Sequence, residues 1–318
     1  MTAFLILVWM NSAQAAPVAT TATRLARGAP SISDATTIHP RTQRHAPLSR
    51  LLEPGDRVAE EGVTCDACHM LKDVEAGGAQ ARLTYALAEE TRWGTICDAQ
   101  GHYFHKTGCS PLFKEARLCA GCHRWSMRSP GGQTLRVLTE VDEWEASPAA
   151  AAGKTCQACH MRPTRDEVAT GWQRQTDVGG HDLLGEGKGL RRDSVRVKVR
   201  AEEQQAGLNV EVELTNAGGA HAAPTGFPGR QLALELSLLD AAGEVRAREE
   251  RVYARVLVDG AGREVPFHAA HREASDNRLI AGETRRESFS FGGVAGASAL
   301  RARLLWRSVS PAIAAAAG

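Results

Sequence analysis

The sequence of 318 residues predicts an α+β protein of two domains, a mainly helical and irregular domain followed by an antiparallel β-sandwich. Between residues 51 and 190 the chain carries three copies of a Cys-x-x-Cys-His motif and little regular apolar pattern beyond short helices. From about residue 191 apolar and polar residues alternate with a period of two, as in strands with one buried face. We therefore place the two domains at 51–190 and 191–309.

The first fifteen residues resemble a secretory signal peptide. Residues 3–10 form an apolar core and Ala-Gln-Ala at 13–15 is a cleavage site of the A-x-A type, but no Lys or Arg precedes the core. The apolar run is too short to cross a bilayer, and no later stretch is long and apolar enough. We expect an exported, soluble, periplasmic protein without an integral membrane span. Residues 16–50, rich in Ala, Thr, Pro and Arg, predict a flexible lead-in.

The three Cys-x-x-Cys-His motifs are the attachment signature of c-type haem. The thiols of each motif bind two vinyl groups of the porphyrin, and the histidine binds the iron from the proximal side. Structural zinc sites pair such motifs into closed sets of four ligands, and three copies do not divide into pairs. A redox-active dithiol would need one copy only. The sequence predicts three covalently bound haems c, held by Cys65, Cys68 and His69, by Cys119, Cys122 and His123, and by Cys156, Cys159 and His160.

Two cysteines lie outside the motifs. Cys97 and Cys109 bracket His102 and His105. In an oxidising compartment they form a disulfide that closes this loop, worth roughly 3 kcal/mol, or they are two unrelated buried thiols. The sequence leaves both alternatives open.

Other segments of the first domain predict short elements. Residues 139–144 predict the start of a helix with Thr139 as its N-cap. Residues 171–190 are rich in glycine and predict a loop that carries His181.

The second domain contains seven strand candidates of six to nine residues. They are 194–201, 208–215, 231–239, 245–251, 252–257, 286–291 and 300–306. Residues 240–243 (Asp-Ala-Ala-Gly) predict a hairpin turn. Several short strands at such spacing predict a sandwich of immunoglobulin-like type. The Ala-rich residues 310–318 predict a frayed tail.

The group on the distal side of each iron decides what the haem does. Two strong axial ligands make an electron carrier, whereas an open position permits substrate binding. Met70 and Met161 directly follow proximal histidines and cannot easily reach the opposite face, and Met127 is a weak candidate. Histidines outside the motifs exceed the three that are needed: His39, His45, His102, His105, His181, His221, His268 and His271.

Several segments resemble the periplasmic multihaem c-type cytochromes related to the tetrahaem carriers of ammonia oxidisers. They are residues 105–112 (HKTGCSPL), 118–123 (LCAGCH), 143–148 (EWEASP), 156–161 (CQACHM) and the Gly-His-Asp of 180–182. Residues 219–228 (GAHAAPTGFP) are similar to a signature of members with a C-terminal sandwich, and the resemblance runs from about residue 60 to 306. Members often carry a further haem motif near the N-terminus, which this chain lacks.

The resemblance implies that His105, His181 and His221 are distal ligands, with His45 in reserve. A turn residue before a strand is the alternative for His221. His268 and His271, in a polar stretch between strands, are interpreted as surface residues.

We expect an electron carrier, rather than an enzyme, that passes electrons between donor and acceptor proteins through closely packed, mostly bis-histidine haems. One alternative is a redox enzyme with a five-coordinate haem that acts on a small nitrogen or oxygen species, but no Cys-x-x-Cys-Lys motif is present. Another is a structural subunit whose β-domain docks to a larger cytochrome complex. The net charge of +1 gives no indication of a nucleic-acid partner.

Overall fold

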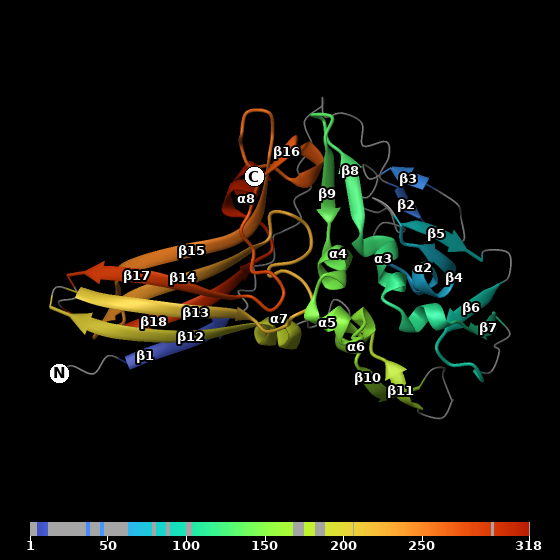
Figure 1. The fold of residues 1–318 in the computed structure, drawn as a ribbon, viewed down its shortest axis with the longest axis horizontal. Helices are drawn as coiled ribbons and strands as arrows, with labels where there is room; N and C mark the ends of the chain where they lie inside the picture. The colour runs from blue at the N-terminus through green and yellow to red at the C-terminus, as the bar shows by residue number, and fades with distance from the viewer. Residues whose placement is uncertain are drawn as a thin grey trace. The chain divides into compact units, whose positions relative to one another are not determined.

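The computed structural model describes most of the chain as two compact units that interleave along the sequence (Figure 1). The motif unit comprises residues 18–126 and 155–157, and the sheet unit comprises residues 1–17, 127–154 and 158–317. The described residues are 63–77, 81–86, 90–99, 104–167, 175–181, 188–205, 207–293 and 296–317, with the backbone of strands β1 (Leu5–Asn11), β2 (Thr36–Ile38) and β3 (His45–Pro47). The rest of the predicted lead-in lies outside them. The predicted domain ranges 51–190 and 191–309 stay a prediction.

The motif unit is built from short helices and two-stranded ladders. Strands β4 and β5 pair antiparallel, and β6 and β7 pair parallel. Its small core contains Leu71, Val74, Leu112 and Phe113. The elements are α2 (Cys65–His69), β4 (Leu71–Glu75), β5 (Arg82–Tyr85), β6 (Thr91–Gly94), β7 (Lys106–Cys109), the 3₁₀ helix η3 (Pro111–Lys114) and α3 (Arg117–His123).

The prediction of a mainly helical domain over 51–190 is wrong. Within the described part of the chain no helix exceeds seven residues, and α2 coincides with its Cys-x-x-Cys-His motif. Helices this short are not stable by themselves, because forming the first helical turn costs free energy and the few residues that follow do not recover that cost. The segments between the motifs instead form strands, in which Leu71 and Val74 are the buried positions of β4. The motifs fix one helical turn each, and their surroundings are predominantly β.

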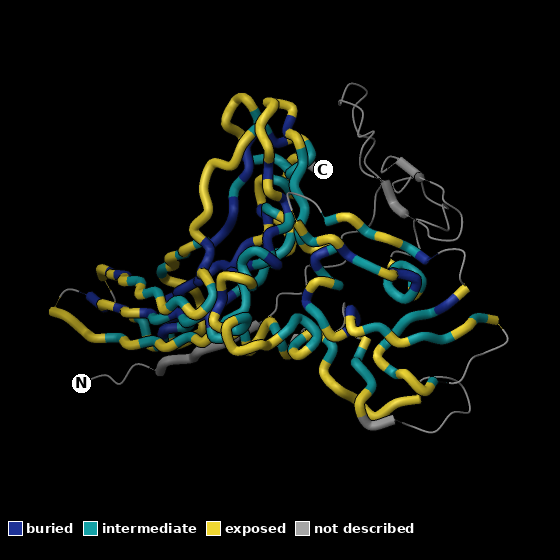
Figure 2. Tube along the Cα trace, turned by 45° about the vertical axis from the view of Figure 1, so that its right-hand side comes forward, coloured by how far each residue is buried: buried dark blue, intermediate teal, exposed yellow. Residues whose placement is uncertain are grey.

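The sheet unit contains two sheets that share one hydrophobic core (Figure 2). The smaller sheet has the order β12–β13–β17, and the larger has the order β1–β18–β14–β15–β16, with only β1 and β18 parallel. Leucines of β14 and valines of β13 line the core. The strand bounds are β12 (Val195–Gln204), β13 (Gly207–Asn216), β14 (Gln231–Asp240), β15 (Val245–Val258), β16 (Arg272–Asp276), β17 (Thr284–Gly292) and β18 (Ala297–Arg307).

All predicted strands of this region are present, with one difference. Residues 245–251 and 252–257 form the single strand β15. Residues 231–240 are central in the larger sheet and are buried on both faces apart from Asp240. The immunoglobulin-like β-sandwich stays a prediction.

Shorter elements of the sheet unit connect and cover these strands. β8 (Trp125–Arg128) crosses from the motif unit and pairs with β9 (Thr134–Leu138). Residues predicted as a frayed tail form α8, whose first turn is capped by the buried Ser310. No described helix is long and apolar enough to span a membrane. The remaining elements are α4 (Glu140–Glu145), α5 (Pro148–Ala151), α6 (Cys156–His160), β10 (Pro163–Asp166), β11 (Gln175–Gly179), α7 (Lys188–Ser194), η4 (Phe267–Ala269) and α8 (Pro311–Ala317).

Candidate haem-binding sites

The histidine of the first motif is oriented by a main-chain oxygen. His69 ends α2, and its Nδ1 atom lies 2.6 Å from the carbonyl oxygen of Trp93 in β6. A carbonyl oxygen can only accept a hydrogen bond, so Nδ1 carries the proton and donates it. Nε2 therefore keeps the lone pair that binds a metal, which is the usual arrangement in metal-binding histidines.

Two aromatic residues contact His69, Phe113 through its ring and Trp93 through its main-chain oxygen, and both have features that fit a haem. The ring of Phe113 lies 5.4 Å from the imidazole, with 18° between the planes. The indole Nε1 of Trp93 is buried and has no hydrogen-bond partner within the part of the chain that the structure describes. A buried donor without a partner is destabilising, and the propionate groups of a haem are acceptors that would satisfy it.

Polar contacts attach α2 to the neighbouring strands. Arg92 of β6 donates two hydrogen bonds to the carboxylate of Asp66, at 2.6 and 3.1 Å. The hydroxyl of Tyr85 in β5 donates to the carbonyl oxygen of Ala67 at 3.2 Å. Burial raises the pKa of Tyr85 to about 12, so the hydroxyl stays a donor at neutral pH. These contacts fix the helical turn that presents the first pair of thiols.

The second motif lies on α3, which packs against the β4–β5 ladder. Ala120 is fully buried, and a Cβ atom at Gly121 would overlap the side chain of Leu83. Arg117 at the start of α3 donates to the carboxylate of Asp73 at 2.6 Å. The two residues between the cysteines are therefore small because the helix approaches the ladder closely.

Cysteines of all three motifs lie near one another in the motif unit. The thiols of Cys119 and Cys156 lie close enough to interact, which raises the pKa of Cys119 and lowers that of Cys156 to about 7. Burial raises the pKa of Cys68, and the nearby Cys122 raises it further. The three attachment points are thus neighbours rather than dispersed sites.

The third motif brings together two predicted ligands. The rings of His160, at the end of α6, and His221 are 6.2 Å apart between centroids, and their planes differ by 26°. An imidazole nitrogen binds a metal at about 2.0–2.1 Å, so one metal between two imidazoles sets their centroids roughly 6 Å apart. The Nδ1 atom of His221 lies 3.3 Å from the carbonyl oxygen of Ala222, to which it donates. The spacing and the tautomer both fit an iron held between these rings.

His105 directly precedes β7, inside the loop that Cys97 and Cys109 bracket. The two cysteines form a disulfide with 4.7 Å between their Cα atoms. The half-buried His105 has its Nδ1 atom 3.1 Å from the carbonyl oxygen of Lys106. Its tautomer is therefore the same as that of His69, and its role as a distal ligand stays a prediction.

For His181 and His45 the role of distal ligand stays a prediction. His181 follows β11 and is exposed. His45 begins β3 but its side chain lies outside the described residues, as do His39 and His102. His268 and His271 were interpreted as surface residues, yet both are half-buried, and burial lowers the pKa of His268. His271 fits closely against Gly131 and Gly260.

Sequence reasoning missed the residues that orient the motifs. Trp93 is 24 positions from His69 and contacts it through a main-chain oxygen, for which no residue type is required. Phe113 and Tyr85 follow no motif spacing. Tertiary pairing brings them to α2, so a local pattern could not identify them.

No family model matches the chain, and no curated protein is similar to it in sequence. The crystal structure of a penta-haem cytochrome c552 from Thermochromatium tepidum is similar in fold, with a TM-score of 0.61 and 22% sequence identity. The similarity covers 88% of this chain and 81% of that chain. The two chains therefore share a fold over most of their lengths.

Proposed function

We propose that the protein is a multihaem c-type cytochrome that carries electrons between donor and acceptor proteins. Three covalent haems are held by the nine motif residues. The fold shared with a penta-haem cytochrome supports the class, and the three attachment motifs support a count of three haems in this chain. The observation that carries the proposal is the 6.2 Å separation of His160 and His221.

An iron between two imidazoles has no open coordination position. Such a haem exchanges electrons at its porphyrin edge and does not bind a substrate at the metal. This favours a carrier over a haem enzyme at the third motif. His105 and His181 are proposed as distal ligands of the other two haems.

The grouping of the motif cysteines supports transfer within the molecule. Electron tunnelling weakens steeply with distance, so haems whose attachment points are neighbours exchange electrons rapidly. Cys119 lies near Cys156, and Cys68 lies near Cys122, so the sulfurs of the three motifs are close to one another. The export pattern at residues 1–15 supports a periplasmic location, where thioether attachment and a disulfide are both compatible with the redox conditions.

The replacement His221→Ala tests the proposal. We expect one of the three ferric haems to become high-spin and to bind cyanide or carbon monoxide, as measured by absorption and EPR spectroscopy. Added imidazole should return that haem to low spin. The control His268→Ala should keep the wild-type spectrum. An unchanged spectrum in His221→Ala would remove this residue from the ligands and contradict the proposal at the third haem.

A further inference from the structure

The loop that carries His221 is held by hydrogen bonds to residues outside it. Residues 219–228 connect β13 to β14, and Asn216 at the end of β13 donates to the carbonyl oxygen of His221 at 2.9 Å. Ala223 and Leu279 exchange two main-chain hydrogen bonds of 2.8 and 3.0 Å. The backbone on both sides of the imidazole is therefore held in place.

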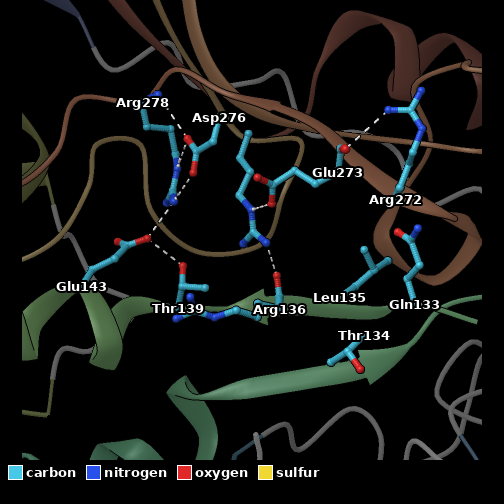
Figure 3. Close-up of a pocket in the computed structure, with 11 residues that line it drawn as sticks. Gln133, Thr134, Leu135, Arg136, Thr139, Glu143, Arg272, Glu273, Asp276 and Arg278 are labelled. Atoms are coloured by element: carbon cyan, nitrogen blue, oxygen red, sulfur yellow. Dashed lines mark hydrogen bonds and ion pairs between the residues drawn. The ribbon is translucent and has the colours of Figure 1, made fainter.

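Glu143 holds the residue next to His221. Its carboxylate accepts a hydrogen bond of 2.9 Å from the main-chain N–H of Ala222 through Oε2. Its Oε1 atom accepts from the hydroxyl of Thr139 at 2.7 Å and from Arg278 at 2.7 Å (Figure 3). Glu143 belongs to α4, which lies between the second and third haem motifs in the sequence.

Arg278 holds Glu143 and a second point of the loop. Its side chain is only 8% exposed and forms ion pairs of 2.7 Å with Glu143 and with Asp276. A further hydrogen bond, of 3.4 Å, runs from Arg278 to the carbonyl oxygen of Pro224. The N–H groups of this buried guanidinium need Asp276, Glu143 and Pro224 as hydrogen-bond acceptors. Because a buried N–H group without an acceptor is costly, the carboxylate of Glu143 is restricted to its observed position.

The contacts form a continuous path to the imidazole. Glu143 fixes the N–H of Ala222, and the carbonyl oxygen of Ala222 accepts the proton on Nδ1 of His221. A metal-binding histidine depends on such a partner at its other ring nitrogen for its orientation. Moving Ala222 would therefore rotate the ring and displace its Nε2 atom.

We propose that Glu143 and Arg278 are positioning residues for His221. They hold Ala222, and with it the imidazole of His221 at its observed place 6.2 Å from the ring of His160, where the two rings would hold the iron. The inference rests on the proposed role of His221 as a distal ligand. What the inference adds is that iron binding by His221 depends on the ion pair of Glu143 and Arg278, although neither residue binds the iron.

A cavity of about 520 Å³ beside the pair offers a matched control. Arg255 and Glu273 also line it and form an ion pair of 2.7 Å. Arg255 is 7% exposed, close to the 8% of Arg278, and its other side-chain hydrogen bonds go to Arg136 and Val137. These contacts do not include residues 219–228, so Glu273→Gln weakens an ion pair of a similarly buried arginine away from His221, although Glu273 itself is more exposed than Glu143 (41% against 19%).

The experiment compares ferric spectra of the full haem-containing protein in Glu143→Gln, Arg278→Lys, Glu273→Gln and His221→Ala. We expect Glu143→Gln and Arg278→Lys to convert part of one haem to high spin, with reversal by added imidazole. Glu273→Gln should remain like the wild type. Because Arg278→Lys keeps a cation, it serves as the second variant if Glu143→Gln does not fold.

Three results would overturn the inference. Wild-type spin states in both Glu143→Gln and Arg278→Lys, beside a high-spin haem in His221→Ala, would show that the pair does not position the ligand. An equal high-spin fraction in Glu273→Gln would show a general loss of structure. An unchanged spectrum in His221→Ala would instead reject the proposed ligand, and with it the premise of the inference.

Discussion

Main-chain oxygens set the tautomer of three histidines that are predicted to bind iron. The Nδ1 atoms of His69, His105 and His221 each lie within 3.3 Å of a carbonyl oxygen. The proton is thereby fixed on Nδ1, and Nε2 presents its lone pair. A motif histidine and two predicted distal ligands share this feature, although they lie in different local structures.

Asp276 gives a prediction for acidic pH. Burial opposes its ionisation, but the hydrogen bonds and charge of Arg278 outweigh this effect and hold the pKa of Asp276 below its usual value. A carboxyl with a lowered folded-state pKa stabilises the fold above its unfolded pKa of about 3.9, and this contribution is lost as the pH falls through the folded-state value. We expect Asp276→Asn to weaken the pH dependence of the free energy of unfolding in this window, measured by urea titration. Parallel curves for variant and wild type would contradict it.

At the residue scale the sequence predicted the motif ligands but not their surroundings. The spacing of Cys156, Cys159 and His160 is local and needs no fold to be recognised. The role of Trp93 depends on β6 lying beside α2, and that of Glu143 depends on a contact with a loop 79 positions away. Such contacts are set by tertiary structure, and no short pattern encodes them.

At the scale of single elements, Gly207 tests how β13 pairs with β17. A Cβ atom at Gly207 would overlap the carbonyl oxygen of Phe291, whereas its register partner Gly292 has no atom within 4 Å of such a Cβ position. We expect Gly207→Ala to reduce the free energy of unfolding by about 1–3 kcal/mol, because the ladder must shift to admit the methyl group. Gly292→Ala should stay within about 0.5 kcal/mol of the wild type.

Far-ultraviolet circular dichroism during urea unfolding of the haem-containing protein measures both changes. Equal effects of Gly207→Ala and Gly292→Ala would contradict the steric reason, because the two residues occupy one register position. The comparison separates a backbone clash from the general effect of alanine in a strand.

Strands and helices differed in how well the sequence predicted them. The alternating pattern located β12, β13 and β14 because each of these strands has a buried, regular face. Around the motifs the ladders are only four or five residues long, too short for a periodic signal. At Thr139 the helix start was predicted, but the hydroxyl donates to Glu143 rather than capping the backbone of α4.

At the scale of the whole molecule, three haems predict a stoichiometry. Reductive titration of the oxidised protein should consume three electrons per chain, since each haem iron accepts one. The double variant Cys156→Ala and Cys159→Ala should consume two electrons and should lose the mass of one haem. Coulometry and mass spectrometry of the intact protein measure these quantities. A wild-type uptake of fewer than three electrons would contradict the proposed haem content.

The interleaving of the two units could not be predicted from the sequence. Residues 155–157 belong to the motif unit, while the chain on either side of them belongs to the sheet unit. Sequence periodicity changes near residue 191 and so suggested a boundary there. The alternation of residues along the sequence shows where one kind of secondary structure gives way to another. It does not show which distant segments pack together, and that packing defines a compact unit.

The eight cysteines also impose an order on the making of this protein. Cys97 and Cys109 form a disulfide in the structure, while in the proposed cytochrome the six motif thiols must stay reduced until each forms a thioether. Thiolates exchange with disulfides, and the lowered pKa of Cys156 beside Cys119 increases the thiolate fraction of this pair. Haem attachment is therefore favoured before these neighbouring thiols are oxidised. The timing of haem delivery then limits the yield of the haem-containing protein.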